Sequence, residues 1–216
     1  DARHRRLLER GITVSNERPS LLTTGSTVSA AENIVAWLKP ELLNEPQQNK
    51  PDRVSVIERH IGQFSTPAEV KTWLSDRDGC IRLAALRVRN IRAQAGGTVG
   101  DITWAAYVMA TDAWGYPRDT RCEVLVGKLV RRIVQRGAAN GMKAERLATS
   151  VSADNIYSGG LNELGLTMWA VTWEQEFRLD DEIDLATLPD FLRLGATLQV
   201  GDGTTPIKGV INVREP

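Results

Sequence analysis

Two glutamates close to two tryptophans are the residues of this chain that most resemble a catalytic set. They lie in the segment LTMWAVTWEQEF (166–177), as Glu174 and Glu176 after Trp169 and Trp173. Paired carboxylates hydrolyse glycosides, and on one strand face these two would have Cβ atoms roughly 7 Å apart. Side chains alternate along a strand, however, so the tryptophans would lie on the opposite face. We therefore predict that both glutamates are solvated or salt-bridged, and that one core face carries Trp169, Val171, Trp173 and Phe177.

The other residues that could do chemistry form no recognisable set. His4 lies in a charged segment and His60 in a strand pattern, and the nucleophile-elbow sequence GxSxG is absent. Cys80 and Cys122 are far apart without a CxxC motif, and we expect buried free thiols. The glycine turns AGG, SGG and GDG do not precede helices as a phosphate loop does. We predict no catalytic residue, no cofactor and no metal site, and hence a protein that is not an enzyme.

Composition and charge narrow the class of protein. The hydrophobic content of 42% and charged content of 25% are typical of a globular chain rather than a disordered one. The 27 basic and 27 acidic residues cancel, which argues against a domain that holds nucleic acid by bulk charge. No apolar run is long enough to span a membrane, and no signal peptide is expected. A net charge near zero gives little electrostatic repulsion between copies of the chain, which suits a protein that assembles.

The elements that must position these residues follow from apolar periodicity and from turn residues. We expect helices at 27–43, with Ser29 as its cap, at 65–74, and at 118–137, where Gly137 would end the helix. We expect strands at 54–64, 80–91, 101–111 and 166–178, and a short strand within 145–165. The fold class is therefore α+β, with a mostly antiparallel β-sheet flanked by α-helices. We divide the chain into an N-terminal arm (1–25), an α+β domain (26–182) and a C-terminal extension with a β-hairpin (183–216).

Basic residues gather at the end of the 118–137 helix, and acidic residues follow the Trp-rich strand. A solvated helix face complementing the helix dipole is one interpretation of the basic cluster, and contact with phosphates is another. A third is a contact between subunits, with the basic cluster of one copy against the acidic run of the next. The candidate interface residues are Arg131, Arg132, Arg136, Asp180, Asp181 and Glu182.

Two apolar runs around a GDG turn predict a β-hairpin in the C-terminal extension, TLQVGDGTTPIKGVINV (197–213). A hairpin alone is marginally stable in water, so it must pack on something else. We expect it to pack on, or add strands to, a neighbouring subunit or partner protein. The candidate contact residues are Leu198, Val200, Ile207 and Val210.

Three segments together resemble the tail terminator proteins of tailed bacteriophages. They are STPAEVKTWL (65–74), GYPRDTRCEVLVGKLVRRI (115–133) and DNIYSGGLNELGLTMWAVTWEQEFRL (154–179). The resemblance is to the Mu-like group, and more distantly to the terminator of phage lambda. It covers residues 27–180 in the order of elements, and excludes the arm and the hairpin.

The resemblance implies a non-catalytic structural protein of the virion, assembled in the host cytoplasm. Such proteins are small α+β subunits that form a hexameric ring on the last ring of the tail tube. The ring stops tube polymerisation, contacts the tail tube protein below, and presents a surface to the neck or head-completion protein above. Genomic DNA passes through its lumen without sequence-specific binding, and no membrane is involved.

Two other classes of protein remain open. One is another structural phage protein, either a neck connector or a tail tube subunit. The other is a carbohydrate-binding or glycoside-cleaving domain, which the six tryptophans suggest. Among these tryptophans only Trp114, in the AWGYP turn, is expected to be free to stack on a sugar.

Overall fold

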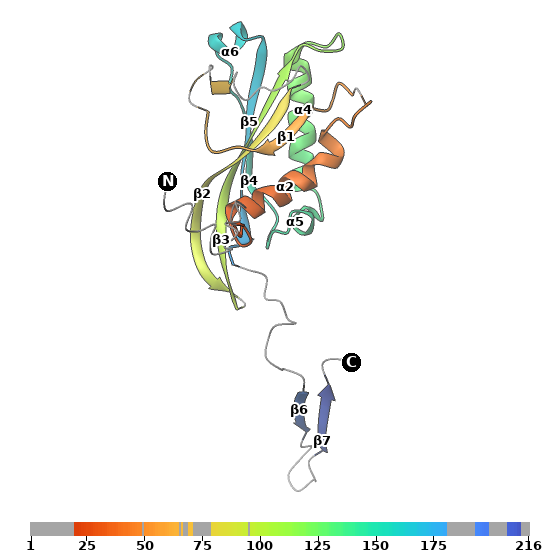
Figure 1. Cartoon of the computed structure of the whole chain (residues 1–216), viewed down its shortest axis with the longest axis vertical. Coiled ribbons are helices and arrows are strands. Elements are labelled where there is room, and N and C mark those ends of the chain that lie inside the picture. The colour runs from red at the N-terminus through yellow and green to blue at the C-terminus, as the bar shows by residue number, and fades with distance from the viewer. Residues whose placement is uncertain are drawn as a thin grey trace, which may run out of the picture. The chain divides into compact units, whose positions relative to one another are not determined.

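The computed structural model describes residues 20–180, with gaps at 49, 65, 67–68, 71–78 and 95, and the backbone of 193–198 and 207–212. The chain divides after Leu179 into two compact units (Figure 1). The predicted N-terminal arm lies almost entirely outside the described residues. None of the helices in the described part of the chain is long and apolar enough to cross a membrane.

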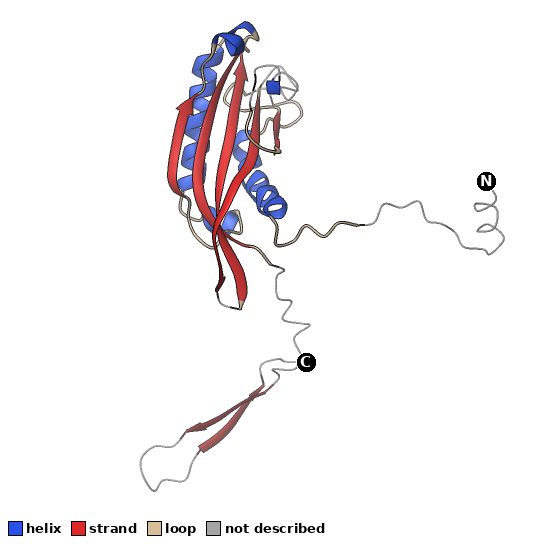
Figure 2. Ribbon diagram, turned by 90° about the vertical axis from the view of Figure 1, so that its left-hand side faces the viewer, coloured by secondary structure: helices blue, strands red, loops and turns tan. Residues whose placement is uncertain are grey.

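The first unit is built on a five-stranded sheet in the order β1-β2-β3-β5-β4. β1 pairs with β2 in parallel, and every other pair in this sheet is antiparallel. Figure 2 shows the strands side by side with a long helix along one face. The predicted α+β class is therefore confirmed. The strands are β1 (Val56–Arg59), β2 (Cys80–Gln94), β3 (Gly97–Thr111), β4 (Thr149–Asn155) and β5 (Leu166–Arg178).

The first helix, α2 (Thr27–Leu42), starts at a capping box. Ser26 is the N-cap, and its hydroxyl accepts from the amides of Val28 (3.1 Å) and Ser29 (3.4 Å). The Ser29 hydroxyl accepts in return from the Ser26 amide at 3.3 Å. The prediction of Ser29 as the cap was therefore wrong by one turn, because Ser29 is the third residue of the helix. Pro40 lies in the last turn, and the helix ends two residues later.

The helix predicted at 118–137 is α4 (Arg118–Val134), and it ends earlier than expected. Its buried stripe includes Cys122, Leu125, Leu129 and Ile133. Gln135 has an extended backbone, so the helix stops before the glycine. Gly137, at φ 92°, instead caps the start of the short helix α5 (Ala138–Gly141). The assignment of Gly137 as the end of this helix was wrong.

Both faces of the sheet are buried at β3, the central strand. On the first face α4 packs against β3 and β5, α2 packs against β1 and β2, and α5 packs against both helices. Trp104 in this core lies 6.4 Å from Trp173 and 5.6 Å from Phe177 between ring centroids. The predicted core face of β5 is confirmed, although Trp169 is only partly buried. On the second face the short helix α6 (Gly159–Glu163) helps to cover an apolar cluster. This cluster includes Cys80, Ala84, Tyr107, Met109 and Met168.

The remaining differences from the predicted elements concern length. The strand expected at 54–64 is only the four residues of β1, while β2 and β3 each run for 15 residues and absorb much of the AGGTVG turn. Most of the helix predicted at 65–74 lies outside the described residues. The second unit contains the predicted hairpin, formed by β6 (Arg193–Leu198) and β7 (Ile207–Asn212).

Gly141 allows α5 to touch the indole of Trp37. A Cβ atom at this position would lie 2.1 Å from the Trp37 ring. The ring is restrained by the guanidinium of Arg132, which lies 3.5 Å from its centroid. We expect Gly141→Ala to lower the free energy of unfolding by about 1–3 kcal/mol, measured by chemical denaturation. The control is Gly62→Ala, where nothing lies within 4 Å of the added methyl group. Equal stability of the two variants would contradict this packing.

Candidate assembly surfaces

The two glutamates that suggested a glycosidase are held in ion pairs. Glu174 pairs with Arg89, and Glu176 pairs with Arg92. Arg146 is a second partner of Glu176, at 3.4 Å. The Glu176 side chain is 2% exposed, so its charge is neutralised inside the structure. The prediction that these acids are salt-bridged is confirmed, and their side chains lie on the face of β5 opposite Trp173.

Arg132, predicted as a subunit contact, is used within its own subunit. Its guanidinium lies 3.5 Å from the centroid of the Trp37 ring and donates to the Trp37 carbonyl from Nε (3.2 Å) and Nη2 (3.0 Å). It also pairs with Glu41 at 2.9 Å, and the side chain is only 11% exposed. The Trp37 indole donates back to the Arg132 carbonyl at 3.2 Å. Arg132 therefore connects α2 to α4, and little of its side chain is exposed for contact with another copy.

The other members of the predicted interface have different positions. Arg131, in the last turn of α4, and Arg136, two residues beyond its end, are exposed. Neither belongs to an ion pair among the described residues. Asp180 is half-buried and is the first residue of the second unit. Asp181 and Glu182 lie outside the described residues. The exposed part of the basic cluster therefore consists of Arg131 and Arg136.

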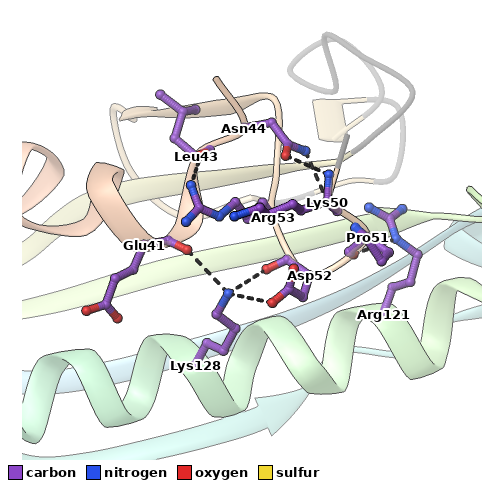
Figure 3. A network of polar contacts seen from close by, with 9 residues as sticks. All are labelled: Glu41, Leu43, Asn44, Lys50, Pro51, Asp52, Arg53, Arg121 and Lys128. Carbon is purple, nitrogen blue, oxygen red and sulfur yellow. Dashed lines mark hydrogen bonds and ion pairs between the residues drawn. The ribbon is translucent and has the colours of Figure 1, made fainter. Parts of the chain in front are cut away.

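The loop between α2 and β1 is fixed to α4 by a polar network (Figure 3). Lys128 reaches from α4 and donates to the Asp52 carboxylate at 2.8 Å, and to the carbonyls of Asp52 and Glu41 at 3.1 and 3.3 Å. Arg53 donates to the Leu43 carbonyl at 3.0 Å. The hydrogen bond from Lys128 holds the pKa of Asp52 below its ordinary value of 3.8. Lys128, like Arg132, is thus occupied within the subunit.

An exposed aromatic turn follows β3. Trp114 and Gly115 have φ angles of 51° and 79°, as in the tight turns that join antiparallel strands. Trp114 is 38% exposed, and the centroid of its ring lies 4.9 Å from the guanidinium of Arg121. This guanidinium donates to the Pro51 and Thr111 carbonyls. A neighbouring hollow of about 200 Å³ is lined by Pro51, Asp52, Tyr116, Thr120, Arg121 and Val124. The sequence indicated the exposure of Trp114 but not that of Tyr116 and Val124.

His60 and the thiols of Cys80 and Cys122 are buried. His60 stacks on Phe64 at 4.2 Å, and burial lowers its pKa. Cys80 and Cys122 are buried free cysteines, as predicted, and burial raises the pKa of both thiols, that of Cys122 to about 12. Within the described ranges, no group of three or more His, Cys, Asp or Glu side chains could hold a metal ion.

The hairpin residues and one sheet edge complete the candidate surfaces. Leu198 and Ile207 are paired at the turn end of the hairpin, and Val210 pairs with Gly195, whereas Val200 lies outside the described residues. The edge of β2 beyond Leu83 pairs with no described strand, since β1 stops there. No local sequence pattern could have revealed this edge, because it depends on how short β1 is.

A scan against known protein families finds no match for this chain, and no curated protein matches it either.

Removal of the Arg132 side chain tests its role within the subunit. We expect Arg132→Ala to lower the free energy of unfolding by about 1–3 kcal/mol, because the stacking on Trp37 and two partly buried hydrogen bonds to its carbonyl are lost. The matched control is Arg131→Ala one residue earlier, where we expect a change within about 0.5 kcal/mol. Both are measured by urea denaturation, and a stable Arg132→Ala protein would refute the role.

The Asp52–Lys128 contact predicts a dependence on pH. A carboxylate whose pKa is lowered by folding stabilises the fold above its unfolded value of 3.8, and this contribution is lost as pH falls through the folded pKa. We expect Asp52→Asn to be less stable than the natural chain at about pH 7, and the difference to shrink as pH falls below about 4. Unfolding free energies measured across this range check it, and a constant difference would contradict it.

Proposed function

We propose that this chain is a structural subunit of a phage virion that caps the end of a tail tube as a ring. In this role it stops tube polymerisation and provides the surface to which the neck or head attaches. It has no catalytic activity and no cofactor. The tail tube protein binds below it, the neck or head-completion protein binds above it, and DNA passes through its lumen.

The observation that supports this proposal most directly is the order in which the resembling segments build the first unit. Residues 115–133 contribute the end of the aromatic turn and nearly all of α4. Residues 154–179 contribute the end of β4, α6 and β5. An α+β unit of this kind, with α4 packed along one face of the sheet, is what a tail terminator subunit is expected to have.

The use of the polar side chains also favours a structural role. Glu174 and Glu176, the strongest candidates for catalysis, are neutralised by arginines of the same chain. Arg131 and Arg136 leave an exposed basic surface that a neighbouring subunit could contact. Ring assemblies are built from such heterologous contacts, in which one patch meets a different patch on the next copy.

A tail tube subunit or a neck connector is the nearest alternative within the same class. A tube subunit forms long polymers, whereas a terminator forms a closed single ring, so the form of the assembly separates them. A carbohydrate-binding role is the second alternative, and the exposed rings of Trp114 and Tyr116 favour it. Loss of oligosaccharide binding in Trp114→Ala, from a starting protein that binds, would support that role instead.

The mass of the purified full chain in solution tests the proposal. We expect a discrete oligomer with ring symmetry in electron micrographs, and six subunits by analytical ultracentrifugation. Arg131→Glu with Arg136→Glu should shift the protein toward monomer, since both residues are exposed and neither forms an ion pair within the part of the chain that the structure describes. Lys39→Glu, an exposed charge on α2, is the control. A natural chain that stays monomeric at all concentrations would overturn the proposal.

A further inference from the structure

Among the described residues, the outer edge of β2 is unpaired along most of the strand. β1 pairs only with Cys80–Leu83 of β2, and the His60 amide adds a bond to the Leu83 carbonyl. From Ala84 to Gln94, no described strand lies on the side of β2 away from β3. The amides and carbonyls of an unpaired edge are a template for another strand. The open segment is longer than the six residues of either β6 or β7.

The charge on this edge limits what can pair with it. Arg87, Arg89 and Arg92 lie along the open segment. Arg89 and Arg92 are paired with Glu174 and Glu176, whereas Arg87 is exposed without an ion pair among the described residues and leaves its positive charge uncompensated. Two copies of β2 pairing edge to edge would place arginines against arginines, which is unfavourable. An extended segment that carries or follows negative charge would instead be attracted to the edge.

The second unit of the chain has these properties. β6 and β7 form a two-stranded sheet and pair with no other described strand. Two strands alone are marginally stable in water, so a third strand would stabilise them. The hairpin also follows the segment LDDEIDLATLPDFL (179–192), which has five acidic residues and no basic ones.

We propose that the hairpin of one copy adds a strand to the open edge of β2 in a second copy. Arg87 of that edge then attracts the negative charge of the acidic sequence that precedes the hairpin, whereas Arg89 and Arg92 stay paired with Glu174 and Glu176. The charges are complementary between copies although each chain has a net charge of zero. Because the donor and acceptor surfaces differ, the contact is heterologous and can be repeated from one subunit to the next. This inference rests on the self-association proposed above and assigns it a donor and an acceptor.

Disulfide trapping between two single-cysteine additions tests the pairing in the full chain. Acceptor variants carry Ile91→Cys or Ala93→Cys on β2, and donor variants carry Thr197→Cys or Lys208→Cys. Thr197 and Lys208 are partners in the hairpin, so the two donors cover addition through either strand. Neighbouring strands place Cα atoms about 4.5–5.5 Å apart, within the range that a disulfide bridges. The natural thiols are buried and should not compete.

We expect mild oxidation of mixed acceptor and donor variants to give a disulfide-linked dimer. The control acceptor is Val124→Cys, which is similarly exposed but lies on α4, and it should give a several-fold lower yield. Equal yields from the two acceptors would overturn the inference. So would a double variant, Ile91→Cys with Thr197→Cys, that closes its disulfide within one chain in preference to linking two.

Charge reversal gives an independent measurement. Arg87→Glu should weaken self-association about two- to tenfold by sedimentation, whereas Lys39→Glu should not. If the natural chain forms rings but neither trapping nor Arg87→Glu distinguishes the β2 edge from its controls, the pairing is wrong and the proposed function stands. If the natural chain does not self-associate, the proposed function itself fails.

Discussion

The central strand β3 needs cover on both of its faces, and the rest of the first unit follows from this constraint. Trp104, Ile102 and Val108 on one face, and Ala105, Tyr107 and Met109 on the other, are buried. The helices α2, α4 and α5 cover the first face, held together by Trp37 and Arg132. The second face is covered by α6 and its neighbours near one end. Toward the other end, the Arg89–Glu174 and Arg92–Glu176 ion pairs take the place of apolar packing, and the Glu176 side chain is almost fully buried.

The cations of this chain divide into two groups with different consequences for assembly. Arg121, Lys128 and Arg132 point into the subunit and donate to backbone carbonyls of the α2–β1 region. These contacts replace the water that such groups would otherwise bind, and they stabilise a loop that has little apolar surface. Arg131, on the same helix, and Arg136, just beyond its end, remain at the surface. Charge density along a helix therefore overstates the surface that is available to a partner.

Much of the fold could be predicted from the sequence, because α2, α4, β3 and β5 are long and strongly periodic. The short helices α5 and α6 could not, since four or five residues leave no periodicity to detect. Gly137 was misplaced because a positive φ serves the start of α5 as well as the end of a helix. The candidate assembly surfaces were harder to predict from the sequence. The position of Arg132 is set by Trp37, 95 residues earlier, and the open edge of β2 is set by strand order.

Trp114 occupies a backbone conformation that glycine adopts without strain and that a bulky side chain adopts at a cost. Its indole nevertheless stays partly in water, next to the buried guanidinium of Arg121. Computational redesign that ranks residues by folding energy alone would exchange this tryptophan for glycine early. A stabilised version of the protein obtained in that way would keep its backbone and lose an indole that is partly exposed on its surface.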